Sequence, residues 1–153
     1  MKKEVKVTID HLTKDGVGVA KIDKKPLYVK NCFANEKVRV CIDYEGKRNL
    51  YGHIQEVIEK NKNRVQPLCS VYEQCGGCHL SFMDYQSQLQ WKQEIVKKIY
   101  EEAGLNQIIV HPCIGMDYPY AYRNKVQTPV QNKKKKIIAG FYKENTHDLV
   151  AFD

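Results

Sequence analysis

Five short runs of alternating apolar and polar residues lie in the first 60 residues, and they constrain the fold more than any other feature of the sequence. In the first run, EVKVTID at 4–10, Val5, Val7 and Ile9 alternate with polar or charged residues. A period of two is typical of a strand with one buried face. Further runs follow at 16–23, 27–33, 36–45 and 50–59. Five short strands at this spacing predict a small closed barrel, because closure removes unpaired edges.

The charge of the chain favours a polyanionic partner. The 153 residues include 25 Lys and Arg against 18 Asp and Glu, a net charge of +7. A basic five-stranded barrel with nearby aromatic rings is compatible with an OB-like module that binds nucleic acid. A solvated basic surface is the alternative explanation. The candidate contact residues are Lys21, Lys30, Arg39, Arg48, Arg123 and Lys125.

Three of the six cysteines lie within ten residues, in the stretch CSVYEQCGGC. Cys69, Cys75 and Cys78 follow the spacing C-x5-C-x2-C, with two glycines between the last two. Closely spaced thiolates can converge on one soft metal centre, and glycines let backbone N–H groups point at sulfur. The spacing favours an iron–sulfur cluster. Zinc, which normally takes two paired knuckles, and a group of reduced thiols without metal are the alternatives.

The remaining cysteines, Cys32, Cys41 and Cys113, have apolar or strand-like neighbours and are expected to be small buried hydrophobes. Cys113 is also a weaker candidate for a fourth ligand or a nucleophile. The chain has no apolar stretch of signal-peptide length and no run of 18 apolar residues, which predicts a cytoplasmic location without membrane contact. Cytoplasmic thiols stay reduced, so clustered cysteines favour metal binding over disulfides.

The expected fold class is α+β, with three parts. Residues 1–60 form the barrel, residues 61–68 a polar linker, and residues 69–153 an incomplete central domain. In the central domain, the pattern predicts a helix at 84–104 with Asp84 as its N-cap and a Schellman stop at Gly104. Antiparallel strands are expected at 122–131, 136–144 and 147–153, with NKKKK in the turn of the first hairpin.

Four stretches carry a resemblance to a known family. They are HLTKDGVGVAKIDKKPLYV, CSVYEQCGGCHLSFMDYQSQLQWK, YRNKVQTPV and GFYKENTHDLV. In this order along the chain, they resemble the TRAM-domain RNA uracil-5-methyltransferases, especially the branch that acts on 23S ribosomal RNA. The cysteine stretch and the helix after it are the most specific part of the resemblance.

The resemblance implies a separate function for each part of the protein. Cys69, Cys75 and Cys78 would hold a 4Fe-4S cluster, with a fourth cysteine a few residues after Asp153. The barrel would be a TRAM domain that binds RNA, with ribosomal RNA favoured over transfer RNA, and the protein would be a monomer. The S-adenosylmethionine pocket and the catalytic cysteine belong to a C-terminal methyltransferase domain. We therefore expect no catalytic and no S-adenosylmethionine-binding residue in this chain, and no activity from the chain alone.

Two other classes of protein compete with this interpretation. One is a stand-alone RNA-binding module in which the cysteines hold a structural zinc ion. The other is a radical S-adenosylmethionine enzyme, because some of those carry a TRAM barrel beside a three-cysteine cluster. Their C-x3-C-x2-C spacing and the position of their barrel, after the catalytic domain, both differ from this sequence.

Overall fold

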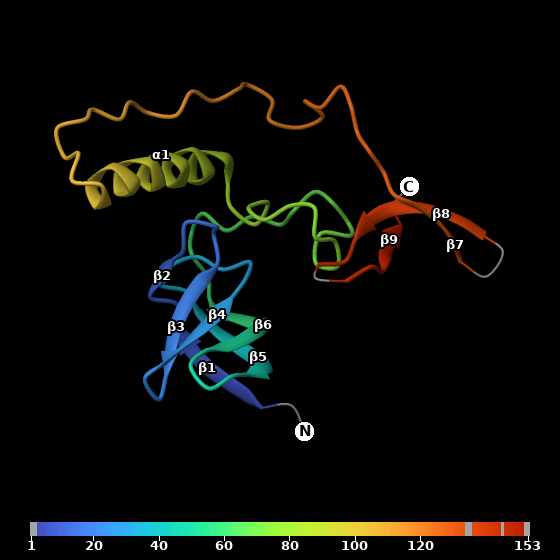
Figure 1. Ribbon diagram of the computed structural model, residues 1–153, viewed down its shortest axis with the longest axis horizontal. Helices are drawn as coiled ribbons and strands as arrows, with labels where there is room; N and C mark the ends of the chain where they lie inside the picture. The colour runs from blue at the N-terminus through green and yellow to red at the C-terminus, as the bar shows by residue number, and fades with distance from the viewer. Residues whose placement is uncertain (1–2, 134–135, 145, 152–153) are drawn as a thin grey trace.

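The computed structural model describes residues 3–133, 136–144 and 146–151. The six strands between residues 4 and 59 form one mixed sheet (Figure 1). The spatial order of its strands is β1-β5-β6-β4-β3-β2. All neighbours pair antiparallel except β4 and β6, which are parallel. The strands are β1 (Glu4–Thr8), β2 (His11–Leu12), β3 (Gly18–Ile22), β4 (Lys25–Val29), β5 (Lys37–Glu45) and β6 (Leu50–Glu59).

The sheet curls into a barrel-like shape because its two edge strands are consecutive along the chain. β1 pairs with β5 and β2 pairs with β3, so the chain changes partners between Thr8 and His11. At this switch, the Ile9 N–H donates to the Glu36 carbonyl at 2.9 Å, and the Asp10 N–H donates to the Val19 carbonyl at 2.7 Å. The first predicted strand, 4–10, therefore ends at Thr8, and the short β2 is a sixth strand that the alternating runs did not predict.

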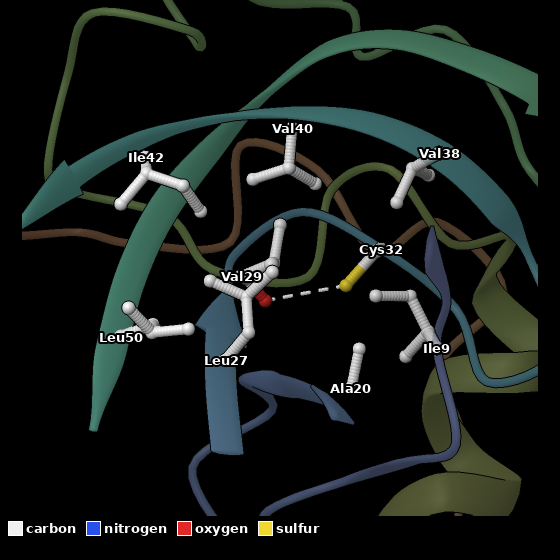
Figure 2. Close-up of a cluster of buried hydrophobic side chains, with 9 residues drawn as sticks. All are labelled: Ile9, Ala20, Leu27, Val29, Cys32, Val38, Val40, Ile42 and Leu50. Carbon is white, nitrogen blue, oxygen red and sulfur yellow. Dashed lines mark hydrogen bonds between the residues drawn. The ribbon is translucent and has the colours of Figure 1, made fainter. Parts of the chain in front are cut away.

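The core of this sheet is formed by the inward residues of the predicted runs (Figure 2). Its buried members are Ile9, Ala20, Leu27, Val29, Cys32, Val38, Val40, Ile42 and Leu50. The Cys32 thiol donates to the Val29 carbonyl at 3.2 Å. A Cβ atom on Gly18 would lie 2.1 Å from Cys32 Sγ, so Gly18 leaves the space that this sulfur fills. Cys32 and Cys41 are buried, as expected.

A buried ion pair joins the barrel to the following segment. The Glu36 side chain is 1% exposed and accepts hydrogen bonds from Arg64 Nε at 2.7 Å and Arg64 Nη2 at 2.6 Å. The backbone N–H groups of Phe33 and Asn61 also donate to it, each at 3.0 Å. Burial alone would raise the pKa of Glu36, but these hydrogen bonds outweigh it and lower the pKa. Part of the predicted linker, 61–68, is thus fixed to the barrel.

A second apolar cluster packs the cysteine-bearing segment against the same end of the barrel. It consists of Phe33, Tyr72, Phe82 and Met83. The Phe33 and Phe82 rings meet edge to face at 5.3 Å, and the Arg64 guanidinium lies 5.0 Å from the centre of the Phe82 ring. These contacts set the position of the loop between Tyr72 and Phe82.

The helix α1 (Tyr85–Glu102) has the predicted ends. Asp84 accepts a hydrogen bond from the Ser87 N–H at 2.7 Å, as an N-cap does. At the other end, the N–H groups of Gly104 and Leu105 donate to the carbonyls of Glu101 and Tyr100, and Gly104 has a φ of 75°. This pattern is a Schellman motif. Among the described residues, no helix is long and apolar enough to span a membrane.

The helix is covered on part of its surface. Near its start, Trp91 lies over the turn at Gly16, where a Cβ atom would be 3.5 Å from the indole. The extended segment 106–129 runs back along the helix, and the Met116 N–H donates to the Tyr85 hydroxyl at 3.0 Å (Figure 1). Val96 and Ile99, in the second half of the helix, remain more than 40% exposed.

The last part of the chain forms a three-stranded antiparallel sheet in the order β7-β8-β9. Its strands are β7 (Val130–Lys133), β8 (Lys136–Tyr142) and β9 (Leu149–Ala151). The predicted strand at 122–131 is wrong for residues 122–129, because that segment is extended but has no partner strand in the described structure. The tip of the predicted NKKKK turn, at 134–135, and the predicted strand end at 152–153 lie outside the described residues.

Candidate functional site

The cysteine loop, which is the stretch 69–78 with its three cysteines, lies between the barrel and the β7-β9 sheet (Figure 1). Cys69 and Cys78 are exposed, and Cys75 is half-buried. The Gly77 N–H donates to Cys75 Sγ at 3.3 Å. A backbone donor to sulfur is one of the interactions that tune an iron–sulfur site. The loop therefore presents three accessible thiols with backbone support for at least one of them.

The loop contacts the β8 end of the second sheet through Gly76. Its N–H donates to the Tyr142 carbonyl at 3.0 Å, and a Cβ atom here would lie 3.1 Å from Glu144 Cα. Glu144 in turn forms an ion pair with Lys30 on the barrel. The glycine thus allows the close approach of two backbones, and three parts of the chain meet around the thiols.

The three cysteines of this loop form a donor set made of sulfur alone. Soft thiolate ligands suit iron–sulfur clusters and zinc. The Gly77 N–H at Cys75 Sγ is a backbone donor of the kind found at iron–sulfur sites. The thiols are therefore chemically suited to hold a metal centre.

Tyr72 connects the cysteine loop to the barrel. Its hydroxyl donates to Asn31 Oδ1 at 2.8 Å. Burial, and then the charge of the neighbouring Cys78, raise the pKa of Tyr72 to about 12. Tyr72 is therefore neutral at pH 7 and acts as a fixed hydrogen-bond donor beneath the loop.

A second group of side chains that could ligate a metal lies on β5 and β6, with Cys41 buried and Asp43 and His53 exposed. Cys41, Asp43 and His53 place one ligand atom each within 4.8 Å of one another. His53 Nδ1 is 2.6 Å from Asp43 Oδ2, and its Nε2 is 2.8 Å from Gln55 Nε2. The sequence interpretation missed this group, because its members have no motif spacing. Only the pairing of Cys41 with His53 across β5 and β6 brings them together.

The other cysteines differ in their suitability for chemistry. Burial, followed by the nearby charge of Glu36, raises the pKa of Cys32 to about 12, so its thiol stays protonated. Cys113 is exposed on the extended segment, which contradicts the prediction that it is buried. Its sequence neighbours are apolar, but this segment makes few contacts that would cover them.

The six predicted RNA contacts are divided between two places. Lys21, Lys30, Arg39 and Arg48 belong to the barrel, whereas Arg123 and Lys125 lie on the extended segment. Arg39 pairs with Glu56 at 2.8 Å, and Lys30 pairs with Glu144. None of the ion pairs in the described part of the chain uses the other four. Of the four predicted contacts on the barrel, Lys21 and Arg48 are thus the two that form no ion pair within the described residues.

Comparison with curated proteins finds relatives along nearly the whole chain, although no protein-family model matches it. An uncharacterized RNA methyltransferase of Halalkalibacterium halodurans is 39% identical over 150 residues, which are 97% of this chain and 33% of the relative. Proteins of the same description from Oceanobacillus iheyensis and Clostridium acetobutylicum are 40% and 36% identical, over 94% and 98% of the chain. The chain spans about a third of the length of these relatives. It is therefore homologous to one part of the bacterial proteins named RNA methyltransferases.

Proposed function

We propose that the chain is the N-terminal part of an S-adenosylmethionine-dependent RNA uracil-C5 methyltransferase that acts on 23S ribosomal RNA in the cytoplasm. The observation that carries the proposal is the 36–40% identity, over almost the whole chain, to proteins named RNA methyltransferases. In this proposal, the 153 residues supply RNA binding and most of a 4Fe-4S site. The order of the cysteine stretch, the capped helix and the antiparallel sheet supports it.

Cys69, Cys75 and Cys78 would hold the cluster. When bound, the cluster would tie three thiolates of one loop to a single rigid centre and so limit the movement of that loop. The chain itself contributes the Gly77 N–H to Cys75 Sγ, and the contact of Gly76 with Tyr142. The Gly76 contact holds the loop against the second sheet, and the Gly77 hydrogen bond orients the Cys75 sulfur within the loop.

We place catalysis outside these 153 residues. The relatives are about three times as long as the chain, which leaves ample length for a methyltransferase domain. Cys32 does not suit nucleophilic attack on a uracil ring, because burial keeps its thiol protonated. The role of this chain is therefore to bind and orient RNA.

RNA binding and methyl transfer test this proposal together. We expect fluorescence anisotropy to show tighter binding of a 23S rRNA stem-loop fragment than of transfer RNA, with an affinity that falls as salt rises. Incubation of the chain with rRNA and radiolabelled S-adenosylmethionine should transfer no methyl groups. Equal or tighter binding of transfer RNA would contradict the rRNA assignment, and robust turnover would contradict the placement of catalysis.

Charge-removal variants test the assignment of the barrel. Replacing Lys21 and Arg48 together with alanine should weaken RNA binding and reduce the slope of log affinity against log salt by about 1 to 2. Replacement of Lys92 and Lys97 together with alanine, two exposed lysines on α1, is the matched control. An equal effect of the control would show that the barrel has no special part in binding.

A further inference from the structure

Three tyrosines lie next to one another on the outer surface of the barrel. Tyr28 on β4 is the register partner of Tyr51 on β6, and Tyr51 is the partner of Tyr44 on β5. The rings of Tyr28 and Tyr51 are stacked, with centres 5.3 Å apart and planes at 22°. The centres of Tyr51 and Tyr44 are 6.2 Å apart. These three residues form a continuous tyrosine ladder across three adjacent strands.

The core does not require these rings. The inward face of the same strands is already filled by Leu27, Val29, Ile42 and Leu50 (Figure 2). Tyr51 is 45% exposed and Tyr44 is 62% exposed. Cross-strand stacking accounts for the position of Tyr28 beside Tyr51, but Tyr44 leaves most of its ring in water. Three adjacent aromatic rings on a solvent-facing sheet are a surface suited to a flat ligand.

The charges around the ladder favour an anionic ligand. Lys47 and Arg48 lie in the turn between Tyr44 and Tyr51, and Lys21 lies on the outer face of β3, beside β4. None of these three cations takes part in an ion pair within the described residues. Two carboxylates of β5 are engaged elsewhere, because Glu45 pairs with Lys25 and Asp43 contacts His53.

We propose that the ladder of Tyr28, Tyr51 and Tyr44 is a stacking platform for the unpaired bases of single-stranded RNA, with Lys21, Lys47 and Arg48 beside the phosphates. The proposal rests on the proposed RNA-binding function and specifies which face of the barrel acts and on which form of RNA. Bases stack on aromatic rings only when they are not paired inside a duplex. The ladder therefore selects single strands, whereas the lysines and arginine attract any RNA.

Binding of two labelled RNAs tests the ladder. The probes are a single-stranded RNA of about 12 nucleotides and a duplex of the same length, measured by fluorescence anisotropy. Tyr51→Leu and Tyr44→Leu remove the aromatic face but keep an apolar side chain suited to a strand. We expect each to weaken single-strand binding about tenfold and duplex binding by less than about twofold. Tyr51→Phe should bind as the unmodified chain does.

The controls separate failure of the ladder from failure of the proposed function. Tyr118→Leu replaces a tyrosine that is 67% exposed on the extended segment and should leave both affinities unchanged. Salt-dependent RNA binding that Tyr51→Leu and Tyr44→Leu do not change, with circular dichroism showing intact folds, would overturn the ladder and leave the proposed function standing. Equal losses for single strands and duplexes would also overturn the ladder. No binding of either RNA by the unmodified chain would overturn both proposals.

Discussion

At the residue scale, the contact between Glu36 and Arg64 decides how the cysteine-bearing segment attaches to the barrel. Glu36 is buried and has donors from Arg64, Phe33 and Asn61. The sequence contains no sign of this pair, because its members are 28 residues apart and follow no period. By contrast, the burial of Cys32 and Cys41 follows directly from their position in apolar runs. Patterns in sequence identify buried faces, but they do not identify partners in long-range polar contacts.

Removing Arg64 should be strongly destabilising. Arg64→Ala leaves Glu36 buried without its charged partner, which costs about 3–5 kcal/mol in the free energy of unfolding. Urea denaturation followed by circular dichroism measures the loss. Lys37→Ala breaks an exposed pair with Glu59 and should cost less than about 1 kcal/mol. Similar losses for the two variants would show that the buried pair is not a special attachment point.

The same pair should make stability depend on pH. The pKa of Glu36 is lower in the folded chain than in the unfolded chain, so its contribution is complete above the ordinary glutamate pKa of about 4.3. The contribution is lost as the pH falls through the lower pKa of the folded state. Stability measured by urea denaturation between pH 6 and pH 3 should therefore decline more steeply for the unmodified chain than for Glu36→Gln. Parallel curves would contradict this assignment.

Gly18 should tolerate no side chain. Gly18→Ala places a Cβ atom 2.1 Å from Cys32 Sγ and should lower the free energy of unfolding by about 1–3 kcal/mol. Because Cys32→Ala removes the clashing sulfur, the double variant should be more stable than the sum of the two single losses predicts. Strictly additive losses in urea denaturation would mean that the two positions do not compete for one space.

At the element scale, local chemistry explains why some elements could be predicted and others could not. The ends of α1 are encoded by Asp84 and by Gly104 followed by Leu105, which act within one turn of the helix. The strand predicted at 122–131 failed for 122–129, because alternation indicates extended backbone but supplies no partner to pair with. The short β2 was not predicted, because it exists only through the pairing of His11 and Leu12 with β3.

The C-terminal stop of α1 offers a test at this scale. Gly104→Ala should cost about 1 kcal/mol in unfolding free energy, because an alanine at a φ of 75° is strained although there is open space around the site. Gly104→Asn should cost less, since asparagine tolerates this conformation better. Thermal and urea denaturation of both variants measure the difference. No loss for alanine would show that the helix frays before Gly104.

At the scale of the whole molecule, the cysteine loop is held from two sides. Tyr72 and, just before the loop, the Glu36–Arg64 pair attach it to the barrel, and Gly76 joins it to the β7-β9 sheet. The assignment of Cys69, Cys75 and Cys78 as metal ligands stays a prediction from the sequence spacing, whereas their placement between these parts could not be predicted from it. The sequence also indicates aromatic rings near the basic residues of the barrel, but the adjacency of Tyr28, Tyr44 and Tyr51 arises only from strand pairing.

The most direct test of the account is the metal content of the chain after anaerobic reconstitution with iron and sulfide. We predict iron and acid-labile sulfide in similar amounts, visible absorbance typical of an iron–sulfur cluster, and little zinc. Cys69→Ser, Cys75→Ser and Cys78→Ser should each lose most of the cluster, while Cys113→Ser should retain it. One zinc per chain without labile sulfide, or equal cluster content in all four variants, would contradict the account.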